Sequence, residues 1–205
     1  EFGRAFGAIT VTREGAFDAL PYLSEVIALH RNYSPWFKNK SFLLEHIGSI
    51  MDFYHSRCVD QKIGGFIQHF RDDGSVYDFE TRHLVSSTRF IFNYSMAAKQ
   101  FNDENYLTVA RHGVDFLRQV HRNQKTGGYA WIMKGREIKD STNYCYGLAF
   151  VLLAYSTSYK AGVVEAKAYI GETCDLMDKY FWIESDGVYC DEISADWSNI
   201  SDYRG

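Results

Sequence analysis

Cysteine, proline and long apolar runs are all scarce in this sequence. Its 205 residues include four cysteines and two prolines, and no CxxC or Cys/His spacing occurs. This usage argues against a zinc site and a disulfide framework, and it favours a reduced, cytoplasmic setting. The longest apolar stretches, such as 148–155, are far too short to cross a bilayer, and no basic start with an apolar centre marks a signal peptide.

An excess of positive charge is also lacking. The net charge of −4 and the absence of a basic run argue against a general electrostatic grip on nucleic acid or anionic membranes. The composition, 46% hydrophobic and 17% aromatic, is typical of a globular chain with one or at most two domains. So many aromatic rings suit a sugar site, because they offer flat apolar faces to C–H groups, but a large aromatic core would have the same composition.

A repeat of about sixty residues runs through the chain. Gly65, Gly128 and Gly187 are 63 and 59 residues apart, and each follows a segment with helical periodicity. The segments 66–79 and 129–140 are polar and punctuated by glycine, which predicts short hairpins at one rim.

Two kinds of helix alternate within this repeat. Three segments carry a single apolar stripe, as expected for outer helices. The segments 81–101 and 143–159 are apolar on most of their circumference, which predicts buried inner helices. Asp103 is the expected N-cap of the second outer helix. The three stripes are Leu43, Ile47, Ile50 and Tyr54; Leu107, Ala110, Val114, Leu117 and His121; and Ile170, Cys174, Met177 and Phe181.

Two concentric helical layers fit this alternation, either as a closed toroid or as a superhelical solenoid. About three hairpins fit in the chain, whereas six close a ring. Residues 1–33 follow the repeat poorly, and Pro21 interrupts a helical pattern there.

Polar residues on the inner helices are the candidate site. Arg82, Ser86, Arg89 and Asn93 fall at steps of four, three and four, and they predict one polar stripe facing a central funnel. A structural ion pair between Arg89 and a buried carboxylate is the alternative.

The second inner helix and the histidines add fewer candidates. Tyr146, near Asn143, either points into the same funnel or is a core tyrosine with a satisfied hydroxyl. Of the seven histidines, only His83 adjoins the stripe and is a candidate substrate contact. Those on the outer helices, His121 among them, are expected to be structural or exposed.

Several runs resemble the N-acylglucosamine 2-epimerase family, and within it the bacterial mannose isomerases. Thr81–Tyr94 (TRHLVSSTRFIFNY) resembles the first inner helix of these enzymes, and Cys145–Ala154 (CYGLAFVLLA) resembles the second. Ser34-Pro35-Trp36-Phe37 and Asp202-Tyr203-Arg204-Gly205 are also similar. The resemblance covers roughly residues 34–205.

This resemblance implies an all-α fold, an (α/α)6 barrel, of which residues 34–205 form the N-terminal half. It implies a 1,2-proton shift that needs no metal or other cofactor, most simply the isomerisation of D-mannose to D-fructose through a cis-enediolate. Arg89 matches an arginine near the reacting carbons, where a fixed guanidinium stabilises negative charge by about 3 kcal/mol. Tyr146 matches a tyrosine that hydrogen-bonds the sugar, and His83 and Asn93 are further candidates for sugar binding.

The histidines that move protons in the family match no position within residues 1–205. They are expected after Gly205, so we expect these 205 residues alone to be inactive. A missing C-terminal half, or another copy, is expected to close the barrel.

Three alternatives remain open. N-acylglucosamine or cellobiose 2-epimerisation needs the same chemistry with a different reprotonation. An (α/α) glycoside hydrolase or lyase needs a close pair of carboxylates; Glu80 and Asp140 are conceivable, but helix capping explains them better. A helical-repeat carbohydrate-binding module without catalysis would carry exposed ligand residues and no buried arginine.

Overall fold

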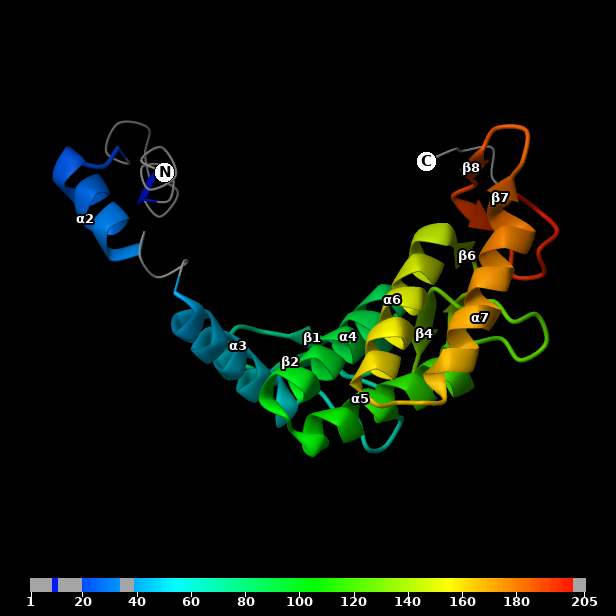
Figure 1. Cartoon of the computed structure of the whole chain (residues 1–205), viewed down its shortest axis with the longest axis horizontal. Coiled ribbons are helices and arrows are strands. Elements are labelled where there is room, and N and C mark those ends of the chain that lie inside the picture. Colours follow the sequence, from blue (N-terminus) through cyan, green and yellow to red (C-terminus); the bar gives the residue numbers. More distant parts are fainter. Residues whose placement is uncertain (1–8, 11–19, 34–38, 201–205) are drawn as a thin grey trace. The chain divides into compact units, whose positions relative to one another are not determined.

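The computed structural model of the chain describes residues 9–10, 20–33 and 39–200 (Figure 1). The similar motifs at 34–37 and 202–205 lie outside these residues. The chain divides into two compact units, Glu1–Tyr54 and His55–Gly205. In the first unit, helix α2 (Leu23–Tyr33) begins two residues after Pro21, and helix α3 (Lys40–His55) runs to the boundary.

The second unit is built from paired helices. α4 (Leu84–Phe101) packs against α5 (Glu104–Phe116) and α6 (Cys145–Ala161), and α6 packs against α7 (Ala166–Leu176) (Figure 1). The last turns of the outer helices α5 and α7 widen into the π-helices η2 (Leu117–His121) and η3 (Met177–Phe181). Inner helices α4 and α6 therefore lie side by side, each with an outer helix, as the alternation of apolar patterns predicts.

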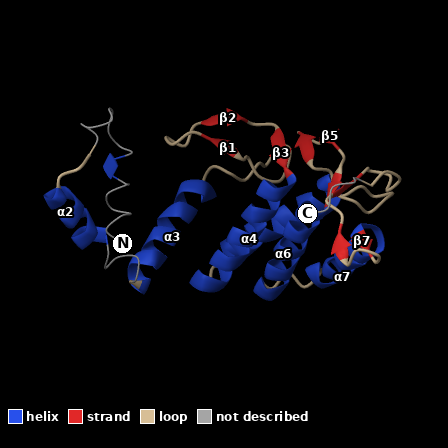
Figure 2. Ribbon diagram, turned by 90° about the horizontal axis from the view of Figure 1, so that it is seen from above, coloured by secondary structure: helices blue, strands red, loops and turns tan. Residues whose placement is uncertain are grey.

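Short antiparallel strands occupy the N-terminal ends of the inner helices. β3 and β6 lead directly into α4 and α6, and β1, β2, β3 and β5 gather at this end of the helices (Figure 2). The predicted hairpins are confirmed as the antiparallel pairs β1–β2 and β4–β5, while β3 pairs with β4, β6 with β9 and β7 with β8. The strands are β1 (His69–Phe70), β2 (Val76–Asp78), β3 (Thr81–His83), β4 (Ile132–Lys134), β5 (Glu137–Asp140), β6 (Asn143–Tyr144), β7 (Trp182–Ile183), β8 (Val188–Tyr189) and β9 (Glu192–Ile193).

One glycine turn recurs in every repeat. Gly64, Gly127 and Gly187 all have positive φ, at 95°, 83° and 67°. The N–H of each donates to the carbonyl four residues earlier, and the three are 63 and 60 residues apart. Left-handed backbone favours glycine, which has no Cβ to clash. The repeat is confirmed. The structurally equivalent glycines are Gly64, Gly127 and Gly187, whereas the sequence comparison had aligned Gly65 and Gly128 with Gly187.

The inner helices begin later than predicted. The expected helix 81–101 starts at Leu84, because residues 81–83 pair with β4 as strand β3. The expected helix 143–159 starts at Cys145 for the same reason, since residues 143–144 pair with β9. The backbone hydrogen bonds of these residues go to neighbouring strands rather than to a first helical turn.

The outer stripes differ in how well they are buried. In α5 and η2 the stripe is confirmed, because Ala110, Val114, Leu117 and His121 are all buried. In α3 it is wrong: Leu43, Ile47 and Ile50 are 39%, 43% and 42% exposed. An apolar stripe is buried only where another element packs on it.

The third stripe and the inner helices also need correction. Cys174 is exposed, and α7 instead buries Ala166 and Thr173 before Phe181. The inner helices, expected to be buried on most of their circumference, each keep one exposed side, because helices cover them on only part of their circumference. We call this side the inner face; it carries Arg89, Asn93 and Met96 of α4 and Tyr146, Phe150 and Leu153 of α6.

Candidate functional site

The inner face brings two predicted site residues onto one aromatic ring. The guanidinium of Arg89 lies 5.0 Å from the ring centroid of Phe150. The ring of Tyr146 lies 4.9 Å from the same ring at 60°, and Tyr146 is 53% exposed. A cation over an aromatic face is attracted by the ring quadrupole. Phe150 was not predicted as a site residue, although it lies one helical turn after Tyr146 in the sequence.

Arg89 is exposed, as expected for a residue of a stripe that faces a funnel, so it is not the buried arginine that would have argued against a binding module. The long side chain emerges from the uncovered side of α4 and rests on an α6 aromatic. Asn93, one helical turn later, is exposed on the same side. Within the inner face, a guanidinium, a carboxamide and a phenol therefore stand beside apolar rings, the mixture that recognises a polyol.

His83 sits at the first turn of α4, where it is the N-cap. Its Nδ1 accepts a hydrogen bond from the Val85 N–H at 3.2 Å, which leaves the proton on Nε2. Burial lowers the pKa of His83, and the nearby positive charge of Arg89 lowers it further. His83 is therefore a neutral imidazole that presents an Nε2–H donor. This arrangement suits a contact to a sugar oxygen rather than a general base.

Trp131 joins the first turns of the two inner helices. Its ring centroid lies 4.3 Å from that of His83 and 4.4 Å from that of Tyr144, the N-cap residue of α6. A Cβ at position 147 would come within 3.1 Å of the Trp131 ring, so Gly147 allows the indole to approach α6. Sequence reasoning missed this row of three rings because hairpin residues carry no helical periodicity.

Arg82 does not belong to the polar stripe. It is fully buried in β3, and its Nη2 forms an ion pair with Asp60 Oδ2 at 2.7 Å. Its Nη1 donates to the Phe79 carbonyl at 2.8 Å. The predicted stripe is therefore wrong at Arg82, because this residue precedes the helix. Ser86, the next residue of the predicted stripe, is half-buried.

The matching residue of the next repeat plays a similar part. Asn143 is buried; its Oδ1 accepts from the Tyr129 N–H at 2.9 Å, and its Nδ2 donates to the Ser194 carbonyl at 3.2 Å. Arg82 and Asn143 thus each stabilise the glycine turn of their own repeat.

The carboxylates near the helix starts do not cap helices. His83 and Tyr144 hold the N-cap positions, so the capping interpretation of Glu80 and Asp140 is wrong. Asp140 instead accepts from the Thr142 N–H inside its own loop at 2.9 Å. The predicted cap Asp103 is confirmed, since it accepts from the Asn105 N–H at 2.8 Å.

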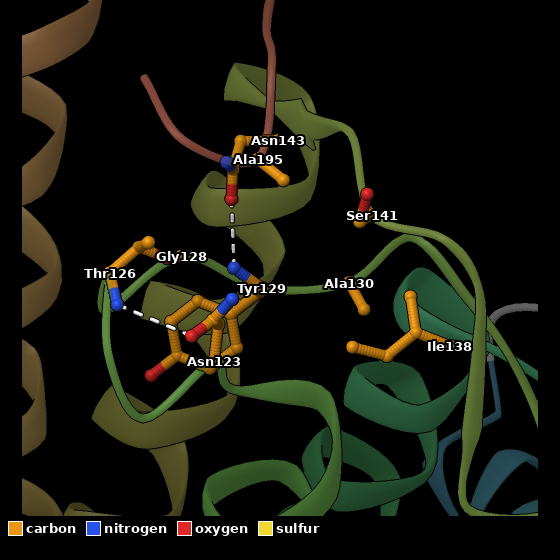
Figure 3. Close-up of a pocket in the computed structure, with 9 residues that line it drawn as sticks. All are labelled: Asn123, Thr126, Gly128, Tyr129, Ala130, Ile138, Ser141, Asn143 and Ala195. Carbon is orange, nitrogen blue, oxygen red and sulfur yellow. Dashed lines mark hydrogen bonds between the residues drawn. The ribbon is translucent and has the colours of Figure 1, made fainter. Parts of the chain in front are cut away.

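A small hollow lies beside the second glycine turn, between Asn123, Tyr129, Ile138 and Asn143 (Figure 3). It has room for about one water molecule. A sugar does not fit there, so the inner face is the stronger candidate site.

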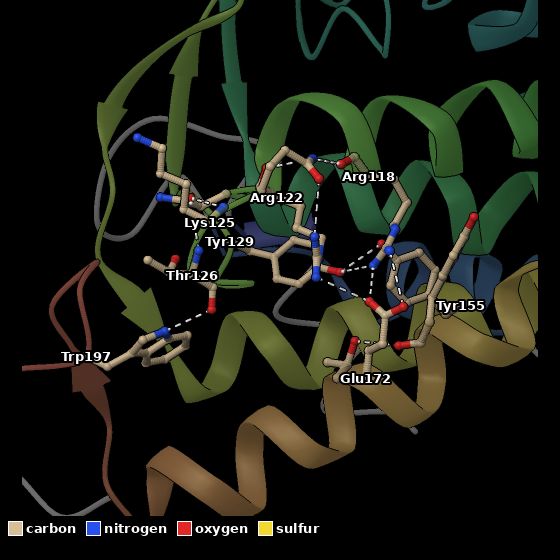
Figure 4. Close-up of polar contacts among 12 residues, drawn as sticks. Arg118, Arg122, Lys125, Thr126, Tyr129, Tyr155, Glu172 and Trp197 are labelled. Carbon is tan, nitrogen blue, oxygen red and sulfur yellow. Dashed lines mark hydrogen bonds and ion pairs between the residues drawn. The ribbon is translucent and has the colours of Figure 1, made fainter.

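A polar network ties the outer helices together (Figure 4). Arg118 of η2 forms an ion pair with Glu172 of α7 at 2.7 Å, and its guanidinium lies 3.9 Å from the Tyr169 ring centroid. The hydroxyls of Tyr129 and Tyr155 are 3.0 Å apart. These contacts join two repeats and are structural.

The described residues hold neither a metal-binding cluster nor a membrane-spanning helix. No three His, Cys, Asp or Glu side chains in that part of the chain are grouped so that they could hold a metal ion. Of the helices described, none has the length and apolar character needed to cross a membrane.

The chain matches one protein family and several curated relatives. The family model described as N-acylglucosamine 2-epimerase matches residues 65–205. A D-mannose isomerase from Marinomonas mediterranea is 52% identical over 171 residues, which are 83% of this chain and 43% of that protein. A cellobiose 2-epimerase from Dictyoglomus turgidum is 28% identical over 124 residues, 60% of this chain and 32% of that protein.

The chain is also similar to solved structures of proteins with the same names. A crystal structure of D-mannose isomerase is 51% identical and superposes with a TM-score of 0.79, covering 82% of this chain and 44% of that one. The cellobiose 2-epimerase from Bacillus thermoamylovorans, at 21% identity and a TM-score of 0.68, shares the fold over 73% of this chain and 39% of its own. The chain thus spans less than half the length of these relatives.

Proposed function

This chain belongs to the N-acylglucosamine 2-epimerase family, and we propose that it is the N-terminal half of a sugar isomerase that converts D-mannose to D-fructose. Its fold is all-α and of the (α/α)6-barrel type, of which it supplies about half. We assign the half-barrel to residues 34–205 and set residues 1–33 apart from it. The cysteine spacing supports a reduced, cytoplasmic setting.

One observation supports this proposal most. The chain is 52% identical to a D-mannose isomerase, and the residues that resemble the sugar-binding arginine and tyrosine of the family, Arg89 and Tyr146, meet on Phe150. They project from the side of α4 and α6 that the other helices of the second unit leave uncovered. In a closed barrel that side would line the central cavity, where a sugar would satisfy their hydrogen bonds.

Each group of the inner face has a role in the proposed reaction. Removal of the proton beside the carbonyl of the open-chain sugar gives a cis-enediolate, and reprotonation at C1 gives the ketose. Arg89 would stabilise the negative charge that develops on the oxygens, because a fixed guanidinium needs no reorganisation. Tyr146, Asn93 and the Nε2–H of His83 would hydrogen-bond the hydroxyls. The groups that move the protons would follow Gly205.

The remaining alternatives divide by their products. Relatives named cellobiose 2-epimerase, at 28% identity, support reprotonation at C2 as the second candidate. A buried arginine would have argued against a binding module, but Arg89 is exposed. Only a measurement of turnover therefore distinguishes an enzyme from a binding module.

The test is to incubate the full-length protein with D-mannose in heavy water. Fructose labelled at C1 is expected. Label returned to C2 of an epimerised aldose would support the epimerase, and binding without exchange would support the binding module. The 205-residue chain alone is expected to give neither product, and turnover by it would refute the placement of the catalytic histidines after Gly205.

A further inference from the structure

Three polar side chains form a continuous network beneath the first turn of α4, and we call them the Ser87 network: Gln68, Ser87 and His121. Ser87 and His121 are 2% and 0% exposed. Gln68 Nε2 lies 2.8 Å from Ser87 Oγ, and Ser87 Oγ lies 3.1 Å from His121 Nε2. The three residues come from the first hairpin, α4 and η2, so the network joins two repeats.

The direction of every hydrogen bond in the network follows from its ends. His121 Nδ1 lies 3.0 Å from the Ala130 carbonyl, which can only accept, so Nδ1 carries the proton. Burial lowers the pKa of His121 to about 4, so the ring is neutral near pH 7 and its Nε2 accepts the Ser87 hydroxyl proton. Ser87 Oγ in turn accepts from Gln68 Nε2–H, and Gln68 Oε1 accepts the His83 N–H at 2.7 Å.

Both ends of the network hold a residue of the candidate site. One end fixes the backbone of His83. The other fixes the carbonyl of Ala130, the residue before Trp131. The Trp131 carbonyl also accepts the Leu84 N–H at 2.9 Å, and the rings of His83 and Trp131 are 4.3 Å apart. The position of this ring pair therefore depends on a closed set of contacts with Ser87 at its centre.

We propose that Ser87 and His121 are positioning residues, which set the His83–Trp131 pair for sugar binding on the inner face. This proposal rests on the proposed function. His83 offers its Nε2–H in one direction only, because its Nδ1 is engaged by Val85. Loss of the Ser87 hydroxyl would leave Gln68 and His121 without their shared partner, and the His83 backbone would shift with Gln68.

The test compares two buried serines in the full-length protein. Ser87→Ala is expected to lower kcat/KM for D-mannose about tenfold, mainly by raising KM, as the loss of about one hydrogen bond implies. Ser158→Ala is the matched control: Ser158 is also fully buried, and it lies near the far end of α6, where its hydroxyl donates to the Tyr155 carbonyl. It should lower the melting temperature similarly and leave kcat/KM unchanged. Ser87→Thr, which keeps the hydroxyl, should restore most of the lost kcat/KM.

A second readout separates this proposal from the proposed function. The NMR signals of the His83 ring should move in Ser87→Ala and stay in place in Ser158→Ala, whether or not the protein turns over a sugar. If the parent protein is inactive on sugars while the His83 signals move, the function fails and the positioning stands. If Ser87→Ala and Ser158→Ala leave the His83 signals alike, or if the signals move without a change in kcat/KM, the proposal is overturned. Gln68→Met, at a half-buried position, replaces Ser87→Ala if that variant does not fold.

Discussion

The guanidinium of Arg89 lies over the ring of Phe150, 5.0 Å from its centroid, although the two residues belong to different repeats. The same ring contacts Tyr146. One apolar side chain thus holds two polar ones on the open side of two neighbouring helices. This contact turns a pattern of polar residues on separate helices into one surface with a defined chemistry.

Phe150→Leu is expected to weaken this surface without unfolding it. An exposed cation–π contact contributes about 0.5–1 kcal/mol, so KM for the sugar should rise about twofold to fivefold as Arg89 and Tyr146 lose their platform. Steady-state kinetics of the full-length protein measure this. Tyr159→Leu, an exposed aromatic near the far end of α6, is the control and should leave KM unchanged. Equal KM values in the two variants would contradict the role of Phe150.

The fold could be predicted from the sequence further than the site could. The glycine spacing predicted the repeat, and helical periodicity predicted the two helical layers, because apolar spacing reflects burial. The starts of α4 and α6 could not be predicted, since residues 81–83 and 143–144 pair with strands distant in the chain. For the same reason Arg82, placed by helical spacing on the polar stripe, proved to be a buried partner of Asp60.

The candidate site was predicted only where it lies on helices. Arg89, Asn93 and Tyr146 follow helical spacing, and they share the exposed inner face. Trp131 lies in a hairpin, and His121 was expected to be structural or exposed; it is buried and hydrogen-bonded, which agrees with the first alternative only. Its contact with Ser87 depends on how two repeats pack, and no periodicity within one helix reports that.

Arg82→Met should be strongly destabilising. The change leaves the Asp60 carboxylate, whose side chain is 10% exposed, without its buried partner, and such a loss costs about 3–5 kcal/mol of unfolding free energy. Arg111→Met is the control, because the Arg111–Glu165 pair is 43% and 38% exposed and should contribute less than about 1 kcal/mol. Urea denaturation measures both. A loss at Arg82 no greater than that at Arg111 would show that the ion pair is not needed for the glycine turn.

Stability should fall in mild acid because of His121. Its pKa is about 4 in the folded protein and about 6.5 when unfolded, so the unfolded chain binds more protons between these values. The contribution of neutral His121 to the free energy of unfolding is complete above pH 6.5 and is lost as the pH falls toward 4. Between pH 7 and pH 5 the loss is about 2 kcal/mol.

His121→Phe keeps a buried ring and removes the titrating group. Urea denaturation of the parent and of this variant should therefore differ in pH slope, with the parent losing about 2 kcal/mol more between pH 7 and pH 5. The slope is compared rather than the absolute stability, since the variant also loses two hydrogen bonds. Identical slopes would mean that His121 is protonated or accessible in the folded protein.

Two glycine-to-alanine changes should act in opposite directions. A Cβ at Gly128 would overlap the Asn143 side chain that accepts the Tyr129 N–H, so Gly128→Ala should cost about 1–3 kcal/mol. Gly171 lies within α7 with open space around its Cβ position, so Gly171→Ala should stabilise the protein by about 0.5–1 kcal/mol. Thermal denaturation gives both signs. A neutral Gly128→Ala would show that the turn can relax away from Asn143.

The most direct test of the sugar-binding inner face is the rate of D-mannose isomerisation by Arg89→Met in the full-length protein. We expect kcat/KM to fall by about a hundredfold or more, equivalent to about 3 kcal/mol of lost charge stabilisation. The melting temperature should stay within about 2 °C of the parent, because Arg89 is exposed. An Arg89→Met protein that isomerises mannose at the parent rate would contradict the assignment of the inner face as the sugar site.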